Sequence, residues 1–298
     1  SLRRQRQMCI RDRDRLDKGN EVSLISRPAA AAPAVGLMKL YEKGYFELED
    51  PIGSYILEYK NPMVYQADGT LKPAKNPIRV IDVLRHTTGI GKTHPALRKQ
   101  FDLLKSNSSY DLETEVKRMS EIPLAKEPGT FWIYGPSVSI GAYLIEKLTG
   151  IKIDEFLKEE IFHPLQMQDT FFQIPKEKQD RFTTGYFLDK AGGYSLLDHP
   201  KNSLYTQKVT FCNPSGGLAS TIEDLSKFCM MLLNRGTYKG QKILEKHTVD
   251  LMTKDQLNGI RNGKPNVDNH KPNEAIGFGM TFSVITVSYT HLRAHETE

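Results

Sequence analysis

Along the interior of the chain, apolar residues recur three or four positions apart, which is the spacing of α-helices. Residues 34–43 predict a helix that ends at Gly44, where a left-handed residue is needed. Residues 45–56 follow as a loop that leads into a short helix. Residues 78–85 place three apolar side chains on one face and lead into the turn at 86–89. The first part of the chain is therefore expected to be helical.

The middle of the chain predicts three further helices. Residues 137–149 form the clearest one, with Ser137 as the N-cap and Gly150 as the stop. The next helix ends at Pro164, and its apolar stripe consists of Ile153, Phe156, Leu157 and Ile161. A capping box over residues 220–223 opens the third helix, whose apolar face consists of Leu225, Phe228, Leu232 and Leu233.

Strand patterns are weaker than helix patterns in this chain. They are mostly confined to four segments, namely 181–187, 193–197, 207–212 and 276–286. The chain has neither internal repeats nor low-complexity tracts. The pattern predicts a fold dominated by helices.

Composition restricts the class of protein. The chain has 298 residues, of which 39% are hydrophobic and 26% are charged, so it is long enough for a large core. No stretch approaches the roughly 20 uninterrupted apolar residues of a membrane span. The cysteines Cys9, Cys212 and Cys229 are too few and too scattered for a disulfide framework or a cysteine-based zinc site. We interpret Cys212 and Cys229 as small buried apolar residues.

The net charge of +5 lies almost entirely at one end of the chain. Residues 1–18 hold seven basic and three acidic side chains, which leaves only +1 for the other 280 residues. A short arginine-rich end is typical of a solvated or artificial tail, so we expect no nucleic-acid partner.

Both ends of the chain differ in character from the interior. Residues 7–13 and 287–298 resemble translated sequencing-adapter read-through. We therefore expect one domain over residues 21–286, with artefactual tails at 1–20 and 287–298. His291 and His295 have a spacing that suits a metal on a helix, but they have no third ligand nearby, and we expect no metal or other cofactor.

Five segments of the interior resemble the serine β-lactamase and penicillin-binding-protein superfamily. The resemblance is to its class C β-lactamase-related branch of esterases and D-amino-acid peptidases. The segments are AVGLMKLYEKGYFELEDPIGSYI (34–56), VIDVLRHTTGI (80–90), PGTFWIYGPSVSIGAYLIEKLTG (128–150), IFHPLQMQDTFF (161–172) and PSGGLASTIEDLSKFCMMLLNRG (214–236). Each is weak alone, but their order and spacing together make a specific signal.

The resemblance implies an α+β fold of the β-lactamase/transpeptidase-like type. Such a fold has an antiparallel sheet flanked by helices and a helical subdomain, and here strands would be missing at both ends. Family members carry out acyl transfer through a serine activated by a lysine three residues later. Tyr134, at the start of a Tyr-Gly-Pro-Ser loop, matches the tyrosine that acts as the second base. Pro136 stands where the commoner motif has asparagine, which favours an esterase-like member over a β-lactamase.

Two other family motifs do not match this chain. Ser26 is the serine nearest to the expected nucleophile position, but Ala29 stands three residues later, and Ser-x-x-Lys occurs nowhere in the sequence. Ser26 is therefore only a weak nucleophile candidate. The single Lys-x-Gly, at residues 190–192, precedes the 214–236 segment, whereas the family motif follows it, so we read it as a hairpin turn.

The resemblance suggests two functional hypotheses. The first is a β-lactamase-related serine hydrolase acting on a small ester, amide or peptide substrate through an acyl-enzyme, and inactive with the sequence as it stands. The second is a noncatalytic relative that binds a peptide or cell-wall fragment in the same cleft. Location in the periplasm or outside the cell would fit the family, but the sequence decides neither location nor oligomeric state.

Three remaining features have simpler interpretations than catalysis. His86 in the His-Thr-Thr-Gly turn is read as a hydrogen-bonded fold residue rather than a base, and Thr87 and Thr88 are read as caps of the turn. The Asn-Ser-Ser sequence at residues 107–109 matches a glycosylation acceptor, which is a pattern frequent by chance.

Overall fold

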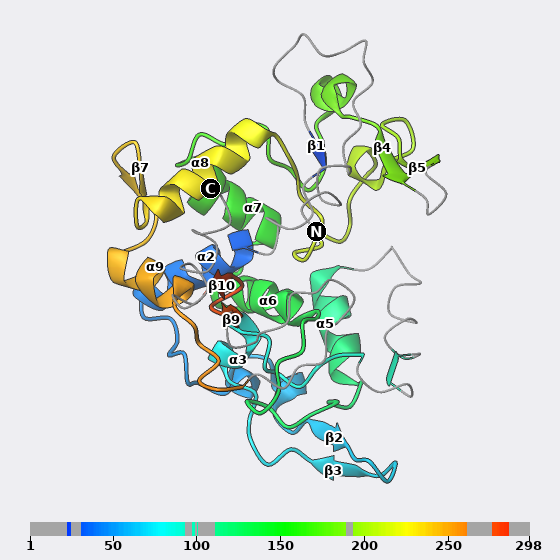
Figure 1. The fold of residues 1–298 in the computed structure, drawn as a ribbon, viewed down its shortest axis with the longest axis vertical. Helices are drawn as coiled ribbons and strands as arrows, with labels where there is room; N and C mark the ends of the chain where they lie inside the picture. The colour runs from blue at the N-terminus through cyan, green and yellow to red at the C-terminus, as the bar shows by residue number, and fades with distance from the viewer. Residues whose placement is uncertain are drawn as a thin grey trace, which may run out of the picture.

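The computed structural model describes residues 23–24, 31–92, 97–98, 100, 111–188, 193–260 and 276–285. Helices pack around a common core, and the strands form short antiparallel pairs (Figure 1). The α-helices are α2 (Ala31–Glu42), α3 (Val80–Leu84), α5 (Leu112–Ser120), α6 (Ser137–Thr149), α7 (Ile153–Leu157), α8 (Ile222–Leu233) and α9 (Lys246–Thr253). The predicted helix-dominated α+β architecture is confirmed.

Shorter helical turns and strands complete the described part of the chain. The 3-10 turns are η3 (Ile52–Ser54), η4 (Leu57–Tyr59), η6 (Lys176–Arg181) and η7 (Leu204–Thr206), and η5 (Lys158–Phe162) is a π-helical turn. The strands are β1 (Ser23–Leu24), β2 (Met63–Tyr65), β3 (Leu71–Pro73), β4 (Gly185–Leu188), β5 (Tyr194–Asp198), β6 (Ala219–Ser220), β7 (Thr237–Tyr238), β8 (Gln241–Lys242), β9 (Ile276–Phe278) and β10 (Ser283–Ile285).

Helix α2 lies in the middle of the molecule, beside α6 (Figure 1). It begins three residues before the predicted start, and every residue from Ala31 to Met38 is buried. Its end matches the prediction: Gly44 has a φ of 73°, its N–H donates to the carbonyl of Tyr41, and the N–H of Tyr45 donates to Leu40. These two bonds make a Schellman motif, which satisfies carbonyls at the end of the helix.

Helix α6 packs between α2 and α3. All of its residues from Ser137 to Ile145 are buried, and a Cβ at Gly141 would lie in ordinary contact with Leu37 and Val83. The predicted N-cap is wrong, because Pro136 occupies that position and Ser137 is the first helical residue. The hydroxyl of Ser137 instead bonds to the ring of His86.

The predicted apolar stripe of the next helix is confirmed, since Ile153, Phe156, Leu157 and Ile161 are all buried. The predicted capping box before α8 is shifted by one residue. Thr221 is the N-cap, and its side chain accepts a bond from the N–H of Asp224.

The apolar face predicted for α8 is only partly correct. Phe228 and Met231 face the core, whereas Leu233 is 75% exposed. Cys229 lies on the exposed side, so its predicted burial is wrong, and Cys212 is only half-buried against the core. Helix α8 ends at Leu233, and in its last turn Met231 is buried whereas Leu233 is exposed.

The strands form separate antiparallel pairs within the described residues. They are β1 with β6, β2 with β3, β4 with β5, β7 with β8, and β9 with β10. The predicted strands near 181–187 and 193–197 correspond to the β4–β5 hairpin, which is displaced by a few residues. The segment predicted at 276–286 is also a hairpin, and the prediction at 207–212 is wrong, because that segment is irregular.

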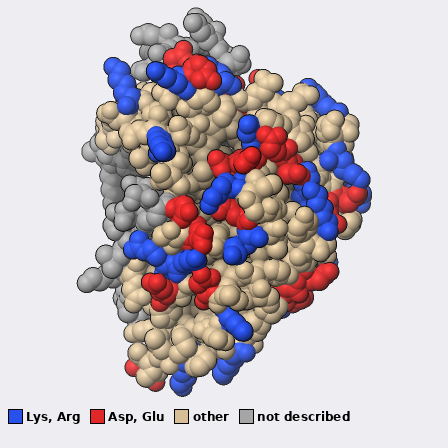
Figure 2. All heavy atoms as spheres, turned by 180° about the vertical axis from the view of Figure 1, so that it is seen from behind, with Lys and Arg blue, Asp and Glu red and all other residues tan. Residues whose placement is uncertain are grey.

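Charged side chains of both signs are interspersed over the rear face of the molecule (Figure 2). Ion pairs in the described part of the chain include Lys39 with Glu160 and Arg235 with Asp250. Among the helices that the structure describes, none combines the length and the apolar character needed to cross a membrane.

Replacing Gly44 by alanine should lower the free energy of unfolding by about 1–2 kcal/mol, because an L-residue is strained at this positive φ. A Cβ at Gly44 would meet no atom within 4 Å, so the cost comes from the backbone alone. Urea unfolding measures the effect. Gly185→Ala is the control, since that glycine lacks a positive φ and has room for a methyl group. An equal loss in both variants would contradict the backbone explanation.

Candidate active site

Tyr134 lies in the loop that leads into α6, and its side chain is 48% exposed. Its neighbours Trp132 and Ile133 are buried on one side of it, and Ser137 is buried on the other. An exposed side chain is thus held between buried residues only a few positions away. This is the accessibility that contact with a substrate requires.

A turn at residues 86–89 holds the loop through backbone carbonyls. The carbonyls of His86, Thr87 and Gly89 accept bonds from the N–H groups of residues 133, 129 and 125, at 2.9, 2.8 and 2.8 Å. Gly89 has a φ of 81°, and a Cβ there would overlap the backbone of Lys126. Only glycine allows the turn and the loop to lie this close.

His86 joins the same turn to the start of α6. Its Nδ1 lies 2.7 Å from Oγ of Ser137, and its ring centroid is 4.7 Å from that of Tyr134. His86 is 1% exposed, and this burial lowers its pKa to about 4. The imidazole is therefore neutral near pH 7. His86 is thus buried and hydrogen-bonded within the fold, as the sequence predicts.

Aromatic side chains surround the ring of His86. Trp132 and Phe278 have their ring centroids 6.5 and 5.4 Å from it, both edge-on, and the Trp132 and Tyr134 rings are 6.1 Å apart. The indole N–H of Trp132 is buried and has no hydrogen-bond partner within the described part of the chain. Together these rings form what we call the aromatic cluster: His86, Trp132, Tyr134 and Phe278.

A buried carboxylate underlies the turn. Asp82, which has no exposed surface, accepts bonds from Arg85 Nη2 at 2.8 Å and from Thr87 Oγ1 at 2.7 Å. Arg79 donates to the other oxygen from both its backbone N–H and its Nε, each at 3.0 Å. Thr87 therefore bonds to Asp82 rather than capping the turn, while Oγ1 of Thr88 accepts from the N–H of Ile90.

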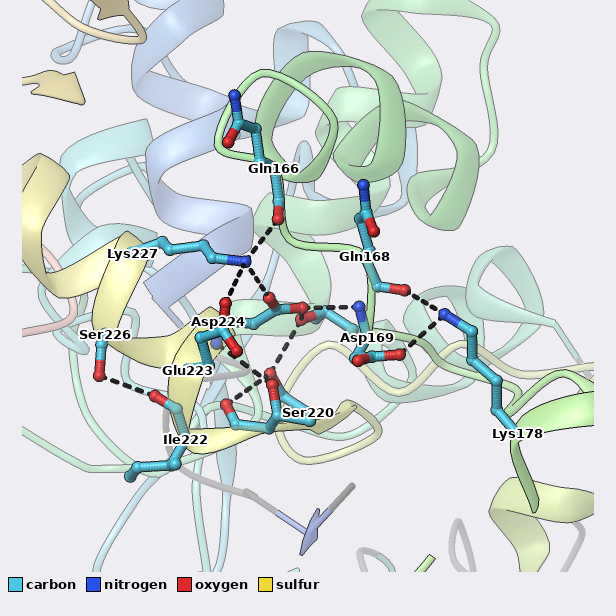
Figure 3. Close-up of polar contacts among 12 residues, drawn as sticks. Gln166, Gln168, Asp169, Lys178, Ser220, Ile222, Glu223, Asp224, Ser226 and Lys227 are labelled. Carbon is cyan, nitrogen blue, oxygen red and sulfur yellow. Dashed lines mark hydrogen bonds and ion pairs between the residues drawn. The ribbon is translucent and has the colours of Figure 1, made fainter. Parts of the chain in front are cut away.

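A second polar network ties α8 to the segment after η5 (Figure 3). The carboxylate of Asp224 accepts from the N–H of Asp169 at 2.7 Å, from Nζ of Lys227 at 2.8 Å and from Thr170 Oγ1 at 3.1 Å. The hydroxyl of Ser220 lies 2.8 Å from that of Thr170, which explains why Thr221, and not Ser220, caps α8. Every member of this network has a partner within it, so we assign it a structural role.

Strand β1 lies beside this network, because Ser23 pairs with Ser220 and Leu24 with Ala219. Ser26 itself lies outside the described residues, as do the Lys-x-Gly at 190–192, the Asn-Ser-Ser at 107–109 and the two C-terminal histidines. The nucleophile role of Ser26 and the base role of Tyr134 stay predictions. No group of three or more metal-ligating side chains occurs among the residues that the structure describes.

A family model described as beta-lactamase matches residues 32–283. The chain belongs to the beta-lactamase family. An uncharacterised protein of Mycobacterium tuberculosis is 26% identical over 282 residues, covering 89% of this chain and 66% of that protein. The N-acetylmuramyl-L-alanine amidase of Bacillus subtilis is 25% identical over 77% of this chain and 54% of its own length. The chain thus spans about half to two thirds of these relatives.

Solved structures show the same fold as this beta-lactamase family chain. EstCE1, a hydrolase with promiscuous acyltransferase activity, aligns with a TM-score of 0.72 and 18% identity over 92% of this chain and 72% of its own. Simvastatin synthase (LovD) from Aspergillus terreus aligns with a TM-score of 0.72 and 19% identity over 90% of this chain and 69% of its own. At these identities the likeness concerns the fold alone.

Sequence reasoning missed Asp82 and Ser137 as parts of this site. Asp82 stands within an apolar run, Val80–Leu84, with an arginine three residues to either side. A carboxylate on the buried face of a short helix, flanked by two arginines, is a readable signal of a buried ion-pair network. Ser137 carries no such signal, because its partner is 51 residues away.

Replacing Asp82 by asparagine should lower the free energy of unfolding by about 3–5 kcal/mol, because two arginines would lose the buried charge that they surround. Chemical denaturation followed by circular dichroism measures the loss. Asp68→Asn is the control, because Asp68 lies in an exposed turn. A loss below about 1 kcal/mol at Asp82 would show that the network does not hold the turn.

The free energy of unfolding should fall by about 3 kcal/mol as the pH drops from 6.5 to 4 on account of His86. The unfolded chain binds a proton at this histidine below pH 6.5, whereas the folded chain binds one only near pH 4, so acid favours unfolding. Urea unfolding at pH 7 and pH 4.5 should show a smaller drop in His86→Asn than in the unmodified protein. His163→Asn, at an exposed histidine, serves as the comparison, and equal drops in all three proteins would contradict the assignment.

Proposed function

We propose that the chain derives from a serine hydrolase that acts by acyl transfer on a small ester, amide or peptide, with Tyr134 as the general base. The observation that carries the proposal is the half-exposed Tyr134 on a loop fixed by buried residues, and the Tyr-Gly-Pro-Ser sequence of this loop resembles the tyrosine loop of the family. Its family membership and its relation to an amidase support the reaction class.

The proposed reaction uses two groups of the protein, a serine hydroxyl as the nucleophile and Tyr134 as the base. A serine hydroxyl attacks the carbonyl carbon, its proton passes to the base, and the leaving alcohol or amine takes up a proton as the acyl-enzyme forms. Water then releases the acid by the same proton transfers in reverse. Tyr134 supplies the proton transfers, and the esterase-like side of the family is favoured because Pro136 replaces an amide-bearing side chain.

The polypeptide with this sequence is proposed to be inactive. Ser26 has Ala29 where the activating lysine belongs, so its hydroxyl keeps the reactivity of an ordinary alcohol. The same substitution is what favours the second candidate, a noncatalytic relative that binds a peptide or cell-wall fragment. Binding needs Tyr134 and its surroundings but no lysine.

We expect neither labelling by a fluorescent penicillin nor hydrolysis of p-nitrophenyl acetate above the level of the Ser26→Ala variant. Gel fluorescence and absorbance at 400 nm measure the two outcomes. Turnover that is lost in Ser26→Ala would overturn the proposed inactivity and establish Ser26 as the nucleophile.

Introducing the lysine by Ala29→Lys, in a protein that also carries the family's third motif after the 214–236 segment, should create ester hydrolysis that depends on Tyr134, because the lysine lowers the cost of deprotonating the serine. Adding Tyr134→Phe should then reduce the rate by at least about 10²-fold while leaving the fold intact. Tyr186→Phe, on β4, is the matched control. Equal rates with and without the Tyr134 hydroxyl would refute the assignment of Tyr134 as the base. If Ala29→Lys gains no activity, binding of acetyl-Lys-D-Ala-D-Ala, measured by calorimetry, would favour the noncatalytic candidate.

A further inference from the structure

His86 contacts the Tyr134 loop on both sides of Tyr134. Its carbonyl accepts from the N–H of Ile133, one residue before, and its ring bonds to Ser137, three residues after. The ring also lies against Tyr134, with 4.7 Å between centroids. One residue thus contacts the loop at three points within five positions.

The backbone of His86 is strained in a way that fits this role. Its φ is 59°, a conformation that costs a non-glycine residue about 1–2 kcal/mol. Such a residue persists only where its surroundings fix it, and here the N–H of Thr87 donates to the carbonyl of Asp82 while Thr87 Oγ1 bonds to the Asp82 carboxylate. The strained conformation does not stabilise the turn. It does allow both the carbonyl and the ring of His86 to contact the loop.

The pair formed by His86 and Ser137 is not a second nucleophile and base. The two residues are 1% and 2% exposed, so no substrate carbonyl reaches the serine. Ser137 is instead placed to fix the rotation of the imidazole, because a ring held at Nδ1 by a hydrogen bond has one orientation about its Cβ–Cγ bond.

We propose that His86 is a positioning residue for Tyr134, with Ser137 locking the imidazole ring against the phenol. The hydrogen bond fixes the rotation of the imidazole ring. The imidazole ring in turn packs against the protein-facing side of the Tyr134 ring and fixes its position. The importance of Tyr134 rests on the proposed function, whereas the positioning itself is a property of the folded chain.

Helix α6 provides a matched control for this bond. Ser139 is as buried as Ser137, at 2% exposure, and lies two residues later on the same helix. Replacing either serine by alanine removes one buried hydroxyl, but only Ser137→Ala removes the bond to His86. Ser137→Thr keeps a hydroxyl and should restore the wild-type state.

The test uses the full chain labelled with 3-fluorotyrosine and observed by fluorine NMR. The chain has 13 tyrosines, and the resonance missing from Tyr134→Phe identifies Tyr134. Ser137→Ala should move this resonance by more than its line width, and Ser139→Ala should leave it in place. The single tryptophan, Trp132, lies in the aromatic cluster, and an unchanged emission maximum shows that the cluster stays buried.

Each outcome decides the proposal. A Tyr134 resonance that does not move in Ser137→Ala, or that moves equally in Ser139→Ala, overturns it, because loss of packing would then suffice. If Ser137→Ala does not fold, His86→Asn provides the measurement, since asparagine tolerates a positive φ and can bond to Ser137 but has no ring. A stationary Tyr134 resonance in His86→Asn would equally refute the positioning role.

The experiment separates this inference from the proposed function. The fluorine resonance reports the placement of Tyr134 without any reaction at a serine. A displaced resonance without hydrolysis in Ala29→Lys would support the positioning role of His86 and contradict the proposed hydrolase. Tyr134-dependent hydrolysis with a stationary resonance would support the hydrolase and refute the positioning role.

Discussion

The carboxylate of Asp82 is the group on which the surroundings of Tyr134 depend. It has no contact with water and is balanced by Arg79 and Arg85 within the protein. A buried charge costs several kcal/mol unless it is paired and hydrogen-bonded. The folded state therefore needs the ion pairs of Asp82 with both arginines. Through Thr87 the same carboxylate reaches the turn whose carbonyls hold the loop.

This chain of contacts produces a rigid frame around an exposed side chain. The carboxylate fixes the turn, the turn fixes residues 125–133 of the loop, and His86 connects the loop to α6. A reacting group works best when its neighbours are locked by packing and by further hydrogen bonds. In this chain the frame is built from the turn after α3, the loop at residues 125–133 and the start of α6.

The helices were predictable because their apolar residues recur at helical spacing, and this is a local property of the sequence. Caps and short strands were not, because they depend on distant partners. Ser137 has the residue type of an N-cap, but His86 uses its hydroxyl, and Ser220 is likewise engaged by Thr170. Strands of two or three residues, such as β1 with β6, are too short to show a periodic pattern.

The candidate site was predictable only where a motif carries it. Tyr134 was found from its Tyr-Gly-Pro-Ser loop, whereas nothing in the sequence pairs the turn at 86–89 with that loop. Leu233 illustrates the opposite error, since helical spacing predicts its burial, whereas in the last turn of α8 the side chain that reaches the core is that of Met231.

Contacts that span most of the chain also order its maturation during synthesis. Arg85 completes its hydrogen bonds with the carbonyl of Gln256, which lies 171 residues later, and the carbonyl of Leu84 accepts from the N–H of Thr281. At about 5–20 residues per second, a ribosome needs roughly 10–30 s to make the intervening polypeptide. During that interval Arg85, one of the two arginines that neutralise Asp82, lacks one of its partners, so the hydrogen bonds around this buried carboxylate are completed only after residue 256 has been made.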